Sequence, residues 1–274
     1  WFSDRSNDPL APTSGYRFRL DLEHASAATL ADFRYNRASA EATGYYPLDL
    51  HRRRVIAGRL RAGAVQPLDG TAAALGLDDA LRGLLHPRKR FYAGGSRSVR
   101  GFRENQLGPR VLTINPNVLI EEAGCTEAGL RDGTCDPNEA PVEDFQPRPA
   151  GGSNVVEASV EYRFPVTNVL QGAVFVDAAR VGASPTALET HSVMAITPGF
   201  GVRYASPAGP VRVDIGIRPR LREELMVLTE VIEDGERRLV RLDTPRIYDP
   251  LDGGSFLNQV LGRIRLHLSI GEAF

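Results

Sequence analysis

Apolar and polar residues alternate along several stretches of the chain, and this alternation is its dominant pattern. The clearest stretches lie at 16–24, 156–164, 211–218 and 263–271. In the first, apolar side chains at even positions face charged ones at odd positions: Tyr16, Phe18, Leu20 and Leu22 against Arg17, Arg19, Asp21 and Glu23. Because successive side chains of a β-strand point to opposite faces, each stretch predicts a strand with one apolar and one charged face.

Weaker alternation predicts four more strands, at about 29–37, 54–64, 172–179 and 195–204, which makes eight strands and a stub at the N-terminus. A soluble β-sandwich also alternates, with its apolar face inward. Here the polar face is rich in Arg, Asp and Glu, as a barrel with lipid outside and a charged lumen requires. Short turns alternate with two long connections, 66–153 and 220–260, and this asymmetry is typical of outer-membrane barrels. We therefore predict an all-β fold, an antiparallel transmembrane β-barrel portion with long outer loops, over a soluble sandwich.

Composition excludes several other classes of protein. The 274 residues carry a net charge of −1, so no basic field points to nucleic acid. No apolar run is long enough for a transmembrane helix, although a barrel strand needs only about 9–11 residues. The first four residues, Trp1 to Asp4, do not resemble the start of a signal peptide. We expect the chain to begin inside a longer precursor.

The two long connections contain recognisable local features. Cys125 and Cys135 lie ten positions apart in a polar, Gly-rich segment, which predicts a disulfide in an exposed loop and an oxidising compartment. A metal site is not expected there, because the two sulfurs lack nearby His partners. A short helix is expected at 71–85. In 220–260 an Asp-Gly turn at 234–235 predicts a hairpin projecting from the barrel rim.

One segment stands apart from the alternation: residues 91–102 read Phe-Tyr-Ala-Gly-Gly-Ser-Arg-Ser-Val-Arg-Gly-Phe. It resembles the Val-Arg-Gly-Phe loop signature of the bacterial outer-membrane β-barrel assembly family, the BamA/TamA-like proteins. Other segments resemble the same family in the same order. They are 8–16, 161–165, 175–177, 198–210 and 267–274. We therefore take the whole chain, 1–274, as a single domain similar to the C-terminal half of that family's barrel.

The resemblance implies a function site built on the signature loop. Its members in this chain are Gly94, Gly95, Val99, Arg100, Gly101 and Phe102. The family's loop folds back into the barrel lumen, where its Arg contacts acidic side chains. Strand parity places Glu161 and Asp177 on the polar face, and Arg suits bidentate carboxylate pairing. We predict that Arg100 pairs with Glu161, Asp177 or both, in a structural role; without the resemblance, Arg100 would simply be a solvated loop residue.

The resemblance also implies a mechanism. The family barrel has sixteen strands behind periplasmic POTRA domains, and its first and last strands meet at a weak seam where a client strand can pair by β-augmentation. Here the closing strand comprises Ile264, Leu266, Leu268, Ile270, Gly271 and Phe274. The implied function is an outer-membrane assembly or translocation factor. Its implied partners are lipids, unfolded outer-membrane or secreted clients and accessory periplasmic or lipoprotein subunits. The alternative is a passive pore or an anchoring barrel of a larger protein.

The width of the lumen constrains this picture. An eight-stranded barrel is just wide enough for its own side chains, so a loop of this length cannot fold inside one. A lumenal signature loop therefore requires further strands, either from a longer chain or from a second copy.

No enzyme is predicted. The five histidines show no metal-binding spacing, and Gly94-Gly95-Ser96 does not fit the Gly-x-Ser-x-Gly nucleophile elbow. Glu161 and Asp177 could form a carboxylate pair in principle, but a nearby Arg would hold both ionised. We expect no catalytic residue, no metal and no cofactor.

Overall fold

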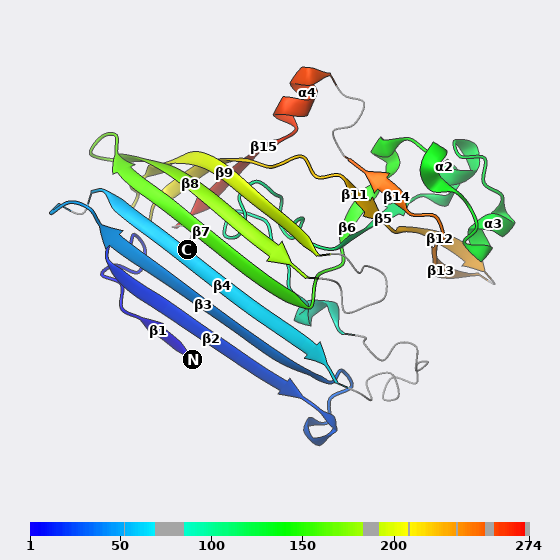
Figure 1. Ribbon diagram of the computed structural model, residues 1–274, viewed down its shortest axis with the longest axis horizontal. Helices are drawn as coiled ribbons and strands as arrows, with labels where there is room; N and C mark the ends of the chain where they lie inside the picture. Colours follow the sequence, from blue (N-terminus) through cyan, green and yellow to red (C-terminus); the bar gives the residue numbers. More distant parts are fainter. Residues whose placement is uncertain are drawn as a thin grey trace.

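Nine strands pair side by side in one antiparallel sheet, in the order β1-β2-β3-β4-β7-β8-β9-β10-β15 (Figure 1). The computed structural model describes residues 1–51, 53–68, 85–182, 192–207, 209–233, 235–249 and 255–271. The strands are β1 Phe2–Asp4, β2 Gly15–Ala25, β3 Tyr35–Pro47, β4 Val55–Pro67, β7 Asn154–Pro165, β8 Leu170–Val181, β9 Val193–Tyr204, β10 Val211–Ile217 and β15 Ile264–Ile270.

One predicted strand, at 29–37, is wrong in position, because the chain turns there and β3 begins only at Tyr35. Residues Ala27–Thr29 form a 3₁₀ turn that Ser26 precedes, and Leu30 adopts a left-handed φ of 54°. The actual strand then runs through small residues, which give little contrast between its two faces. Its middle reads Ala38, Ser39, Ala40, Glu41, Ala42, Thr43 and Gly44.

The sheet exposes its apolar face and buries its charged face, which is the reverse of a sheet in a water-soluble protein. On β7, Val156 and Val160 are 58% and 59% exposed, while Glu157 and Glu161 are 1% and 0% exposed. The other central strands repeat this arrangement, with buried charged side chains inward and aliphatic ones outward. Soluble sandwiches bury their apolar faces instead. The exposed apolar face therefore fits a lipid environment, and the buried polar face fits a lumen.

The two long connections fold together into a second small unit, which we call the cap (residues 110–149 and 223–248). Its four-stranded sheet has the order β13-β12-β5-β6, in which β5 and β12 run parallel although they come from different connections. Figure 1 shows the cap beyond one end of the long strands. Its elements are β5 Arg110–Ile114, α2 Pro116–Glu121, α3 Glu127–Asp132, β6 Gln146–Pro149, β11 Glu223–Leu225, β12 Val227–Glu233, β13 Glu236–Arg241 and β14 Arg246–Tyr248.

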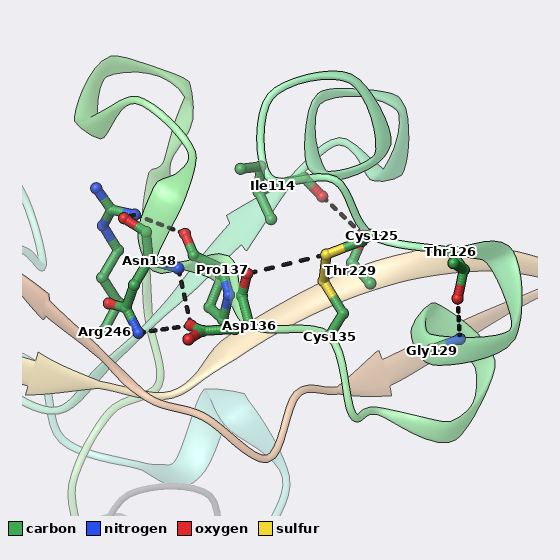
Figure 2. Close-up of a disulfide and its surroundings, with 10 residues drawn as sticks. All are labelled: Ile114, Cys125, Thr126, Gly129, Cys135, Asp136, Pro137, Asn138, Thr229 and Arg246. Atoms are coloured by element: carbon green, nitrogen blue, oxygen red, sulfur yellow. Dashed lines mark hydrogen bonds between the residues drawn. A yellow bond between two sulfur atoms is a disulfide. The ribbon is translucent and has the colours of Figure 1, made fainter.

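The cap has its own apolar core, and the disulfide belongs to it. Cys125 and Cys135 are bonded as predicted, and Figure 2 shows the bond between the two chain segments that it joins. The predicted exposed setting is wrong, because Cys135 is buried among apolar side chains such as Leu119 and Leu130. Those leucines lie on the inward sides of α2 and α3, which the polar composition of the segment had obscured.

The expected hairpin of the second connection is present as β12 and β13, but it does not project alone. Thr229 on β12 donates to the carbonyl oxygen of Ile114 on β5, at 3.0 Å. Arg246 of β14 donates to the carbonyl oxygens of Pro137 and Asn138, at 2.6 and 3.1 Å. Figure 2 shows these contacts around the disulfide. Residues from both connections thus hold the cap together.

One further helix, α4 Phe256–Leu261, precedes β15. Within the described ranges, no helix has both the length and the apolar character needed to cross a membrane. The helix expected at 71–85 falls almost entirely on residues 69–84, outside the described residues.

Candidate functional site

The signature loop, residues 91–102, lies against the buried face of the sheet. Bridges from Phe91 to Gly152 and from Ala93 to Leu107 hold its base. Gly94 and Gly95 adopt φ values of 105° and 108°, a region that favours glycine, and they form the tight turn that starts the loop. Apolar contacts also hold the loop against the sheet, which we call the wall. Val99 and Phe102 are buried in one cluster with side chains of β7, β8 and β9, namely Val155, Ala179, Val181 and Ala195.

Arg100 is the centre of the loop's polar contacts. Its Nε and Nη2 donate to the two carboxylate oxygens of Asp177, both at 2.8 Å, and its backbone N–H donates to the same group at 3.0 Å. Its Nη1 donates to Glu161. The guanidinium is 1% exposed and stacks over the Phe175 ring, 3.3 Å from the centroid. The structure therefore brings Arg100 together with both carboxylates that the sequence singled out.

Further buried charges extend this cluster along the wall. Arg203 of β9 donates to Glu161 at 2.7 Å and to Asp214 of β10 at 2.9 Å. Arg163 donates to the other oxygen of Glu161 at 2.8 Å, and Arg212 lies 3.1 Å from Asp214. Four guanidinium groups thus share three carboxylates, if Asp177 is included. Charges buried this deeply persist only when they are paired and hydrogen-bonded.

The electrostatics hold Arg100 firmly charged. Burial acts to lower the pKa of Arg100, but the hydrogen bond and charge of Asp177, with the charges of Glu161 and Asp214, raise that pKa well above its ordinary value. The guanidinium therefore stays protonated and keeps its ion pairs. This arrangement is suited to fixing a loop in place.

The loop also contacts the last two strands of the sheet. His267 of β15 forms a 2.8 Å hydrogen bond through its Nε2 with the carbonyl oxygen of Arg100. Arg212 of β10 donates to the carbonyl oxygen of Ser96 at 2.8 Å and to the hydroxyl of Ser269 on β15 at 2.8 Å. The signature loop is therefore tied to strands from β7 to β15.

Glycines lie on both sides of the contact between the loop and the wall. A Cβ added to Gly216 of β10 would lie 2.1 Å from the carbonyl oxygen of Arg100. A Cβ on Gly101 would lie 2.4 Å from the Thr197 side chain, and one on Gly199 would lie 2.3 Å from the Phe175 ring. At Gly216, glycine lets two backbones approach closely, and at Gly101 and Gly199 it leaves room for neighbouring side chains.

The closing-strand residues lie on both sides of the wall. The apolar set faces outward, with exposed fractions from 37% at Ile264 to 73% at Leu268. This set comprises Ile264, Leu266, Leu268 and Ile270. Gly271 adopts a φ of 89° and lines a lumenal cavity of about 730 Å³. Phe274 falls within 272–274, outside the described residues.

Sequence reasoning missed several members of the site. Asp214, Arg203 and Arg163 complete the ion network, and Gly216 and His267 contact the backbone of the loop. Alternation at 211–218 already places Asp214 on the polar face, and that signal could have marked it as a partner. Within the part of the chain that the structure describes, no group of three or more His, Cys, Asp or Glu residues could hold a metal ion.

Two comparisons with known proteins relate this architecture to a protein family and to a solved structure. Residues 1–224 match the Omp85 superfamily domain. The structure resembles that of BamA from Haemophilus ducreyi lacking POTRA domains 1–3, with a TM-score of 0.55 and 17% sequence identity. The match covers 88% of this chain and 40% of that one, so the chain spans less than half the length of this neighbour. The neighbour confirms the predicted fold, an antiparallel sheet like that of a BamA barrel, and the domain match confirms the predicted family. The chain belongs to the Omp85 superfamily.

Proposed function

We propose that this protein acts in the bacterial outer membrane as a β-barrel that assembles or translocates other proteins. The observation that supports this proposal most strongly is the docking of the signature loop through Arg100 onto Glu161 and Asp177. A passive wall does not need a loop held by buried charges on β7, β8 and β10. Such an arrangement is costly to build, since each buried ion must be fully paired.

The inverted sheet supports the membrane location. Its outward face consists of exposed aliphatic and aromatic side chains, which membrane lipid would cover. The disulfide of the cap fits an oxidising compartment outside the cytoplasm. Membrane lipids are therefore the first partner that we propose for the chain.

The edge of the sheet supports the proposed action on clients. β15 pairs with β10 along one edge, and no other strand of the described chain pairs along its second edge. A free edge offers backbone groups to an incoming strand whatever its side chains are. We propose that the last strand of an unfolded client pairs at this edge. Accessory periplasmic or lipoprotein subunits are proposed as further partners.

In this mechanism the ion network has a structural role, which is to position the loop. Arg100 fixes the loop on β7 and β8, and His267 links the same residue to β15. The loop thus connects the edge strand to the middle of the wall. We infer that a docked loop keeps β15 in the position from which a client strand can pair.

The test is Arg100→Ala in the complete protein, with Arg97→Ala as the matched control. Both are loop arginines, but the Arg97 side chain is exposed. Removing Arg100 leaves the buried carboxylate of Asp177 without its guanidinium partner, while Glu161 keeps Arg163 and Arg203. Loss of one partner of a buried ion pair costs roughly 3–5 kcal/mol. We expect Arg100→Ala to reduce the amount of folded client in the outer membrane, measured by heat-modifiability on gels, and Arg97→Ala to leave it unchanged. Arg100→Lys, which keeps the charge but loses the planar fork, should lie between them.

The same variants separate this function from the alternative, an anchoring barrel or a passive pore. An anchor needs only a folded barrel. If Arg100→Ala gives a folded barrel and clients still assemble at the normal rate, the assembly function is refuted and the anchoring function is favoured.

A further inference from the structure

The short helix α4 presents an apolar face that nothing in the described chain covers. Four of its six residues are apolar and exposed: Phe256 at 78%, Leu257 at 69%, Val260 at 41% and Leu261 at 63%. At 100° per residue these four lie on one side of the helix, and Asn258 and Gln259 lie on the other. None of the helix's residues is buried. Figure 1 shows α4 standing above the start of β15, apart from α2 and α3.

Local contacts define the helix but do not explain its apolar face. The Ser255 side chain accepts from the backbone N–H of Asn258, and Gly262 closes the last turn by donating to the Asn258 carbonyl oxygen at 2.8 Å. A helix of six residues is marginal in water, and most helical stability comes from packing an apolar face. The occupant of that face must therefore come from outside the described chain.

The position of α4 next to β15 bears on what covers its apolar face. It leads through Gly262 and Arg263 directly into Ile264, the first residue of the outward apolar row of β15. Arg263 fixes this junction on the sheet, because its Nε donates to the Arg218 carbonyl oxygen at 3.0 Å and its own carbonyl accepts from Arg218 N–H at 3.0 Å. The apolar residues of α4 thus lie directly before the outward apolar row of β15, on the strand that we propose lipid to cover.

We propose that α4 is an interfacial helix whose apolar face lies in membrane lipid at the cap end of β15. It shares with such helices an apolar face of aromatic and aliphatic side chains opposite a polar face, and the basic residue Arg263 follows two positions after its end. It adds a contact with the lipid boundary beside the edge where we place the client strand. This inference rests on the proposed membrane function but concerns a different part of the molecule.

Site-specific photocrosslinking tests the proposal in the complete protein in its native membrane. Benzoyl-phenylalanine is placed at Leu257 on the apolar face, at Asn258 on the polar face, and at Leu268 on the outward face of β15 as the lipid reference. After irradiation, mass spectrometry separates lipid adducts from adducts to protein. We expect lipid adducts at Leu257 close to the Leu268 level and several-fold above those at Asn258.

The outcomes separate the two proposals. Lipid adducts at Leu268, with none at Leu257 or with only protein adducts there, overturn the interfacial helix and leave the membrane barrel standing. The same holds if Leu257 and Asn258 give equal yields. Absence of lipid adducts at Leu268 overturns the membrane barrel and, with it, the interfacial helix.

Discussion

The substitution Gly216→Ala gives the most demanding test of how the signature loop is seated. A Cβ at this position would lie 2.1 Å from the carbonyl oxygen of Arg100, 2.4 Å from its carbonyl carbon and 2.8 Å from the nitrogen of Gly101. All three are backbone atoms, so no side chain can rotate away. The loop would have to retreat by more than about 1 Å, because ordinary van der Waals contact begins at 3.4 Å.

Such a displacement is large on the scale of the Arg100 contacts. Its hydrogen bonds to Asp177 measure 2.8 to 3.0 Å, and a shift of roughly 1 Å takes them beyond hydrogen-bonding range. A hydrogen bond to a charged group contributes about 1.5–3 kcal/mol, and overpacking alone costs about 1–3 kcal/mol. We expect loop docking to weaken by about 3 kcal/mol, which raises the undocked fraction by about 10²-fold.

Hydrogen–deuterium exchange of residues 91–102 in nanodiscs measures this effect, and Gly44→Ala provides the control. Gly44 lies in β3 of the same sheet, with no atom within 4 Å of an added Cβ. The Gly216→Ala loop should exchange about 10²-fold faster, in proportion to its undocked fraction, while the control loop stays protected. Equal protection in the two variants would refute the tight seating of the loop on β10 and the role that we give to Gly216.

Two further predictions concern other parts of the chain. Replacing Cys125 and Cys135 together by Ala should destabilise the cap by about 3 kcal/mol and leave the barrel intact, because the disulfide closes a short loop within the cap alone. Comparing hydrogen-exchange rates of residues 110–149 with those of β7 will show whether the loss of stability is confined to the cap. Asp8 accepts hydrogen bonds from the backbone N–H groups of Leu10 and Ala11, which lower the pKa of its carboxyl below 3.8. The contribution of this carboxylate to the stability of the turn is therefore complete above pH 3.8 and is lost as the pH falls through the lowered folded-state pKa. We expect Asp8→Asn to loosen the turn at pH 7. NMR or exchange data in which both proteins loosen only in strong acid would contradict this.

Strand parity and one motif were enough to find the centre of the site. Glu161 and Asp177 could be placed on the polar face because side chains alternate along a strand, and the signature supplied Arg100 as their partner. The family resemblance added what parity cannot give, namely that the loop folds back toward the wall. Alternation also located most of the long strands, since their charged and apolar faces contrast sharply.

The parts that sequence missed depend on neighbours that are distant in the chain. Gly216 and Asp214 meet the loop only because the strand registers bring Gly216 level with Glu161, and Asp214 level with Arg163. Strand register follows from turn geometry and pairing, which a one-dimensional pattern does not record. The cap escaped for the same reason, because its parallel pairing of β5 with β12 joins two connections that each looked like a separate loop.

The pairing of β5 with β12 has a consequence for the order in which the protein folds. The hydrogen bond from Thr229 to Ile114 joins residues 115 positions apart, with four long strands between them. Contacts between residues so far apart in the chain form slowly, because closing the long loop between them costs conformational entropy before the contact contributes any stabilisation. The β-hairpins of β7 to β10 are local and can form first. The cap should therefore become ordered after these hairpins, and a nascent barrel would pass through a stage in which part of its wall exists while its cap is still open.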